Sequence, residues 1–312
     1  MPEVAFVLAE GSRMRELAEV VGHELALQDV AWTVHSGEFP PAALQRVHVL
    51  VDPVGFVAAH GQAALPVEGV LRRSIFICAR LEPRPSAATV SLLRRAGAVF
   101  TLDPRDAVEL AHAGVQARQL RPGYSEALDR GRRDEAREIE VGFLGPLNHR
   151  QSECARLTME VLGDRHCVVI GAGGAGGRDL QERLEALARC RVAIALRRDD
   201  ADPRLEAERV VEAIHAGAAV VCEHGVGVSP LVAGEHLLAG SAPALGFLAR
   251  VLLREPARRE ALRDAARARL RDWLPLALHV AVLRAAVVEL VGEPWPAGMD
   301  PISAVRADGR AG

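Results

Sequence analysis

The chain has 312 residues, of which 49% are hydrophobic and 25% charged, so it can form two α/β domains with substantial cores. Its formal net charge of −3 argues against a nucleic-acid partner, and no apolar run is long enough to span a bilayer. The first residues lack signal-peptide features, and the five cysteines form no zinc or disulfide pattern. We therefore expect a cytoplasmic protein.

The first part of the chain alternates strand-like and helix-like segments. Apolar runs typical of buried parallel strands lie at 3–9, 46–53, 73–79 and 98–102, and the segment 116–122 is expected to form a short strand. Amphipathic segments that predict helices lie at 13–27, 86–97 and 105–115. This alternation predicts a parallel sheet covered by helices on both faces.

A polar segment at 125–139 separates this first α/β region from a second one. The second region has strand-like runs at 140–145, 166–171, 191–196 and 218–223, with helical segments at 149–162, 178–189 and 205–216. Only helical patterns follow, at 242–253, 255–272 and 275–291. The sequence thus predicts an α/β chain of two tandem, doubly wound, Rossmann-like domains with a helical C-terminal end.

A glycine-rich segment, "VVIGAGGAGGRDLQ", suggests a nucleotide-binding turn. Gly171, Gly173 and Gly176 match the G-x-G-x-x-G fingerprint of dinucleotide-binding proteins. However, the motif follows the second strand of its domain, and the next strand ends in Arg197 and Arg198 instead of a ribose-binding carboxylate. We favour a tight turn beside a sugar nucleotide. An NADP site, with Arg197 and Arg198 on the 2′-phosphate, remains an alternative.

Asp200 and Asp202 form a D-x-D pattern, which some glycosyltransferases use to bind a metal diphosphate. Here the pattern lies in a polar loop before a helix, where aspartate is a common capping residue. We therefore expect no metal. The sequence contains no lysine, so any anion must be held by arginine, histidine or backbone N–H groups.

Three ordered segments resemble GT-B glycosyltransferases of the family 4-like group that includes the spore maturation protein CgeB. They are "VGFLGPLNHRQSECARL", "ERVVEAIHAGAAVVCEHGVGVSPLVAGEHLL" and the helical "LGFLARVLLREPARREALRDAARARL". The resemblance covers about residues 140–275 well and the first domain only loosely.

The resemblance implies a GT-B fold whose two domains face a cleft. Residues 1–135 would form the acceptor-side domain and 136–275 the nucleotide-sugar domain. A helix at 276–296 would return to the first domain, and 297–312 would be a loose tail. The implied activity is transfer of a sugar from a nucleoside-diphosphate sugar, with UDP as the first guess, to an unknown small-molecule or glycan acceptor. Retention of configuration and no metal or other cofactor are also implied.

The resemblance also implies roles for residues of the second domain. Glu212 would accept hydrogen bonds from the ribose hydroxyls, since a carboxylate offers only acceptors. Arg209 would contact the diphosphate or pair with a neighbouring glutamate, and Arg150, after the Gly145 turn, would bind phosphate. The remaining candidates for nucleotide-sugar binding are Asn148, Gly171, Gly173, Arg197, His224, Gly225 and Val226.

One position departs from the family pattern. Many family 4 enzymes carry a glutamate eight positions before the one matching Glu212, and this chain has Arg204 there. The departure keeps open a catalytically silent GT-B protein, and the glycine motif keeps open an NADP-binding oxidoreductase. In the first domain, Asp52 at a strand end and His60 are the candidate catalytic residues.

Overall fold

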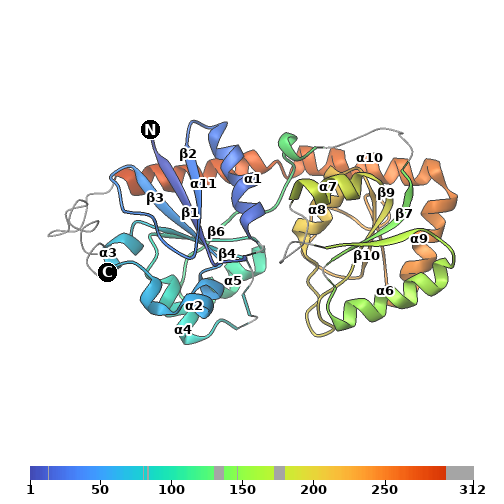
Figure 1. Ribbon diagram of the computed structural model, residues 1–312, viewed down its shortest axis with the longest axis horizontal. Coiled ribbons are helices and arrows are strands. Elements are labelled where there is room, and N and C mark those ends of the chain that lie inside the picture. Colours follow the sequence, from blue (N-terminus) through green and yellow to red (C-terminus); the bar gives the residue numbers. More distant parts are fainter. Residues whose placement is uncertain are drawn as a thin grey trace. The chain divides into compact units, whose positions relative to one another are not determined.

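The computed structural model describes residues 1–12, 14–79, 81–82, 84–129, 137–145, 147–171 and 180–292. These residues form two compact units. Unit 1 contains Met1–Arg121 together with helix α11 (Leu276–Gly292), and unit 2 contains Pro122–Pro275. Both units are built on parallel sheets (Figure 1). No helix in the described ranges is long and apolar enough to cross a membrane.

Unit 1 has a parallel sheet whose described strands follow the order β2-β1-β3-β4-β5-β6. The strands are β1 (Glu3–Leu8), β2 (Ala31–Ser36), β3 (Arg46–Val51), β4 (Ile75–Cys78), β5 (Ala98–Thr101) and β6 (Arg118–Gln119). The helices are α1 (Arg15–Ala26), α2 (Pro53–His60), α3 (Glu68–Leu71), α4 (Ala87–Leu93), α5 (Pro104–His112) and α11. Strands β1, β3 and β4 are almost fully buried, as their continuous apolar runs predict.

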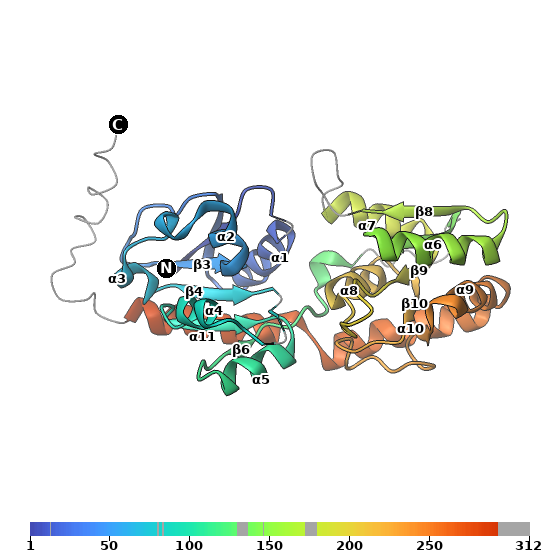
Figure 2. The same cartoon turned by 90° about the horizontal axis from the view of Figure 1, so that it is seen from below.

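The helices cover both faces of this sheet. Helix α11, drawn in red in Figure 2, packs with α1 and contacts β3. On the other face, α2, α4 and α5 contribute Phe56, Leu93 and Leu110 to a core that also holds Phe76. Strand β2 is the half-exposed edge strand, and the sequence did not predict it because its apolar and polar residues are mixed.

Unit 2 has a second parallel sheet, with its described strands in the order β11-β10-β9-β7-β8. The strands are β7 (Ile139–Leu144), β8 (Cys167–Ile170), β9 (Cys190–Ala195), β10 (Ala219–Glu223) and β11 (Leu238–Gly240). The helices are α6 (His149–Leu162), α7 (Leu180–Ala188), α8 (Ala207–His215), α9 (Leu245–Arg254) and α10 (Pro256–Trp273). The α/β fold class expected from the sequence is confirmed.

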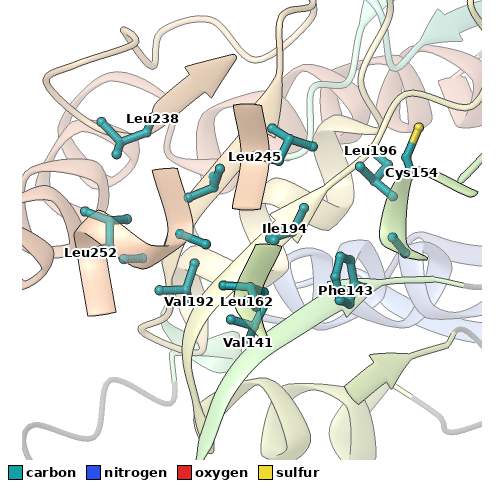
Figure 3. Close-up of a cluster of buried hydrophobic side chains, with 14 of the residues drawn as sticks. Val141, Phe143, Cys154, Leu162, Val192, Ile194, Leu196, Leu238, Leu245 and Leu252 are labelled. Carbon is teal, nitrogen blue, oxygen red and sulfur yellow. The ribbon is translucent and has the colours of Figure 1, made fainter. Parts of the chain in front are cut away.

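Helices lie on both faces of this sheet as well. On one face, α6 and α9 pack over Val141, Phe143 and Ile194 of the central strands (Figure 3). On the other face, α7 packs beside α8 (Figure 1).

Each sheet has one point at which the strand order reverses. In unit 1 it lies between β1 and β3, and in unit 2 between β7 and β9. Ligands of open α/β sheets bind outside the carboxyl ends of the strands at such a switch point. The loops that leave β7 and β9 are therefore where a ligand of unit 2 is expected.

Candidate functional site

The first turn of α6 lies at the switch point of unit 2 and is firmly capped. The Asn148 side chain accepts a hydrogen bond from the Gln151 N–H at 2.9 Å, and the Gln151 side chain accepts one from the Asn148 N–H at 3.0 Å. This reciprocal capping box fixes the direction in which the helix begins. Asn148, a sequence candidate for nucleotide-sugar binding, therefore acts in this structure as a helix cap.

The same turn is tied to the loop that follows β9. Three consecutive carbonyl groups of that loop accept hydrogen bonds from α6 side chains: Asn148 to Arg198 O at 2.7 Å, Arg150 to Arg197 O at 2.9 Å, and Gln151 to Leu196 O at 3.1 Å. The two loops that flank the switch point are thereby held together.

Arg150 forms a bidentate ion pair with Glu223 at the end of β10. The Nη1 and Nη2 atoms of Arg150 lie 2.8 and 2.6 Å from the two Glu223 carboxylate oxygens, and the Arg197 N–H donates to the same carboxylate at 2.7 Å. The Glu223 side chain is only 2% exposed. Its hydrogen bonds raise the pKa of Arg150 above the usual range, so the guanidinium is permanently charged.

A second carboxylate approaches this pair from the solvent. Asp200 lies 2.6 Å from Arg150 Nε and 3.6 Å from Arg197 Nη2, and its side chain is 75% exposed. We call Arg150, Arg197, Asp200 and Glu223 the switch-point cluster. It contains two cations and two anions. An anionic ligand would therefore compete with the exposed Asp200 for the arginines, whereas the buried Glu223 would stay in place.

Glu212 lies on α8 and is paired with a buried arginine of the neighbouring helix. Arg183 on α7 lies 2.9 Å (Nη2–Oε1) and 3.3 Å (Nε–Oε2) from the Glu212 carboxylate. Arg209 pairs instead with Glu206 at 2.9 Å, one of the two contacts expected for it. The sequence-predicted ribose and diphosphate residues therefore have protein partners in this structure.

The segment before α8 carries further charge. Arg204, which replaces the expected glutamate, pairs with Asp202 at 2.9 Å.

Burial, with the charges of Glu206 and Glu212 nearby, raises the pKa of the half-buried Glu208, in the first turn of α8, to about 7. Glu208 is therefore a carboxyl group that holds a proton near neutral pH.

The loop after β10 is anchored to this segment. The Val226 N–H donates to Pro203 O at 3.0 Å, and the Leu205 N–H donates to Val226 O at 3.0 Å. A Cβ at Gly225 would lie 2.8 Å from Pro203 O, so the two segments can approach only because this residue is glycine. His224, in the same loop, is exposed.

The glycine-rich segment is described only at its start. Gly171 directly follows β8, whereas Gly173 and Gly176 lie outside the described residues. Strand β8 is the edge strand of its sheet, beyond β7, so this segment does not leave the strand pair at the switch point. Gly145, which directly follows β7, does leave that strand pair. A Cβ there would lie 2.9 Å from Val169 Cγ1 and 3.3 Å from the Leu147 nitrogen.

The two aspartates of the D-x-D pattern are engaged by arginines. Asp200 pairs with Arg150, and Asp202 pairs with Arg204. Among the residues that the structure describes, no group of three or more His, Cys, Asp or Glu side chains is arranged to hold a metal ion.

The candidate catalytic residues of unit 1 lie near the switch point of their own sheet. Asp52 follows β3 with a left-handed backbone (φ 56°) and caps α2 by accepting from the Gly55 N–H at 3.1 Å. His60 ends the same helix, and its Nε2 accepts from the Glu10 N–H after β1 at 3.3 Å. The intervening eight-residue helix spans about 12 Å, so the two side chains do not form a dyad. With Nε2 accepting, neutral His60 carries its proton on Nδ1.

Sequence reasoning missed three charged residues of unit 2. Glu223 had a signal, because it ends an otherwise apolar strand. Arg183 had a subtler one: positions 180, 183, 184 and 187 form the buried stripe of a helix, and Arg183 occupies one of them. Glu208 had none, since its raised pKa depends on burial in the folded chain.

No protein-family model and no curated protein matches the sequence. Solved structures do match at low identity. HepE of Anabaena in complex with UDP and glucose has a TM-score of 0.63 and 10% identity, covering 93% of this chain and 100% of that chain. Sucrose-phosphate synthase from Thermosynechococcus elongatus has 0.60 and 12%, and WaaG, a glycosyltransferase involved in lipopolysaccharide biosynthesis, 0.59 and 11%, each with the same coverage. With its two parallel sheets and their helices, the chain has the GT-B fold.

Proposed function

We propose that the chain is a glycosyltransferase that moves a sugar from a nucleoside-diphosphate sugar to a small-molecule or glycan acceptor. The observation that carries the proposal is the switch-point cluster, which places Arg150 and Arg197 beside the N-terminus of α6 in a GT-B fold. A helix N-terminus and two arginines are suited to a diphosphate. UDP is the first choice for the nucleotide because HepE was crystallised with UDP and with UDP-glucose.

The mechanism follows from the charge that develops on the departing diphosphate. In the proposed donor complex, phosphate oxygens replace Asp200 at Arg150 and Arg197, and both guanidinium groups stabilise the leaving group. Glu212 accepts hydrogen bonds from the ribose hydroxyls. We propose that the reaction is metal-independent and retains configuration, as in the family 4-like enzymes that the sequence resembles, and that it takes place in the cytoplasm. Because the proposed reaction needs no metal, activity should survive EDTA.

A non-catalytic GT-B protein is the second candidate, and Arg204 is the observation that favours it. An arginine paired with Asp202 stands where a family 4 enzyme has a glutamate. The two candidates differ in turnover: the enzyme hydrolyses or transfers the sugar of a nucleotide sugar, and the non-catalytic protein only binds it. The NADP alternative gains no support from the structure, because β8 is an edge strand.

Isothermal titration calorimetry with UDP, GDP, dTDP and NADP tests the proposed ligand class. We expect saturable binding of UDP and none of NADP. Glu212→Ala should weaken UDP binding by about 1–3 kcal/mol, the cost of losing a charged hydrogen-bond partner. Glu185→Ala is the matched control, because Glu185 is an exposed glutamate on the adjacent helix α7. Unchanged UDP affinity in a folded Glu212→Ala variant would contradict the assignment of Glu212.

A further inference from the structure

Arg183 is the largest side chain that is fully buried among the described residues, and it is 1% exposed. It lies on the apolar stripe of α7, at helical spacing from Leu180, Leu184 and Leu187. Burying a guanidinium is costly, because its charge leaves water and each of its donors needs a partner. Such a position calls for an explanation that packing does not supply.

The Arg183 side chain reaches across to α8 and meets Glu212 with two of its nitrogens. The Nη2–Oε1 and Nε–Oε2 distances are 2.9 and 3.3 Å. Because each carboxylate oxygen faces a different nitrogen of a planar guanidinium, the contact fixes the plane of the carboxylate as well as its position. The Glu212 side chain is 14% exposed, so it remains partly accessible at the surface of unit 2.

Stability alone is a weak reason for this pair. Replacing a buried ion pair by apolar side chains is often neutral or stabilising, so such a pair gives little net stability. The bidentate pair instead fixes the orientation of the Glu212 carboxylate.

We propose that Arg183 is a positioning residue: it holds the Glu212 carboxylate in the orientation that accepts the ribose hydroxyls of the donor nucleotide. This inference rests on the proposed function, in which Glu212 contacts the ribose. It adds a residue from a different helix, and it predicts that ribose recognition depends on a side chain that does not touch the ligand.

The test compares two ligands that differ only in the ribose hydroxyls. UDP and 2′,3′-dideoxy-UDP are titrated calorimetrically into the wild-type protein, Arg183→Met and Arg183→Lys. The wild type should prefer UDP by about tenfold to a hundredfold, the range expected for hydrogen bonds to a charged group. In Arg183→Met the preference should fall to about threefold or less, with the dideoxy affinity unchanged. Arg183→Lys keeps the charge but loses the planar guanidinium, so its preference for UDP should lie between those of the wild type and Arg183→Met.

Arg189→Met is the matched control, since Arg189 follows the same helix and is exposed, with Glu138 as its partner. Its ribose preference should equal that of the wild type. An undiminished preference in Arg183→Met, or an equal loss of affinity for both ligands, would overturn the inference. If Arg183→Met does not fold, a wild-type preference in Arg183→Lys overturns it in the same way. Absence of binding of UDP, GDP and dTDP alike by the wild type would instead refute the proposed function itself.

Discussion

Glu223→Gln tests whether the switch-point cluster is held by its buried carboxylate. Glu223 is 2% exposed and accepts two hydrogen bonds from Arg150 and one from the Arg197 N–H. Glutamine keeps one acceptor oxygen but turns an NH₂ group toward a guanidinium. Removing one partner of a buried ion pair costs about 3–5 kcal/mol. Because Asp200 and the Arg197 carbonyl still accept hydrogen bonds from Arg150, we expect Glu223→Gln to lower the free energy of unfolding by about 3 kcal/mol.

Asp200→Asn is the matched control, because Asp200 contacts the same guanidinium but is 75% exposed. An exposed ion pair contributes about 0–1 kcal/mol, so this variant should unfold almost like the wild type. Urea unfolding followed by circular dichroism gives both free energies of unfolding. Losses of similar size in the two variants would refute the reasoning, because burial would then not decide how strongly a carboxylate holds Arg150.

Two further predictions concern neighbouring residues. Burial raises the pKa of Glu208 to about 7, so the native state keeps its proton at pH values where the unfolded chain, with its ordinary pKa of 4.5, has released it. The free energy of unfolding should therefore fall as pH rises from about 4.5 to about 7, and Glu208→Gln should flatten that slope in urea titrations at pH 5, 6 and 7; an unchanged slope would contradict the assigned pKa. Asn148→Ala and Asn148→Ser both remove the amide that donates to Arg198 O, but serine keeps a capping oxygen, so the alanine variant should be less stable than the serine variant by about 1 kcal/mol; equal thermal shifts in the two variants would count against the cap.

The sequence predicted the buried elements of the fold well, and the reason is physical. A parallel strand covered on both faces is largely apolar, so β1, β3 and β9 can be recognised in the sequence as apolar runs. Strand β2 is half-exposed at an edge and was missed. Helix α2 was missed because "PVGFVAAH" combines glycine with β-branched residues, which are weak helix formers.

The candidate site was less predictable because its contacts cross between loops. The sequence singled out Arg150, Asn148 and Arg197, and the structure brings these three together at the switch point. It did not reveal that Glu223 lies between the two arginines, because strand order decides which loops meet. The β9–β7 pairing that creates this arrangement joins strands separated by β8 in the sequence.

The absence of lysine from the sequence gives this cluster a property that a lysine-based site would lack. A guanidinium presents several donors in a rigid plane, whereas an ammonium group is a single point charge. Arg150 uses Nη1 and Nη2 for the buried Glu223 and Nε for the exposed Asp200. Under the proposed function, a diphosphate oxygen can therefore take the place of Asp200 at Nε while Glu223 keeps the plane of the guanidinium fixed. Because Glu223 is buried and Asp200 is exposed, Glu223 orients the arginine, and Asp200 is the partner that the ligand displaces.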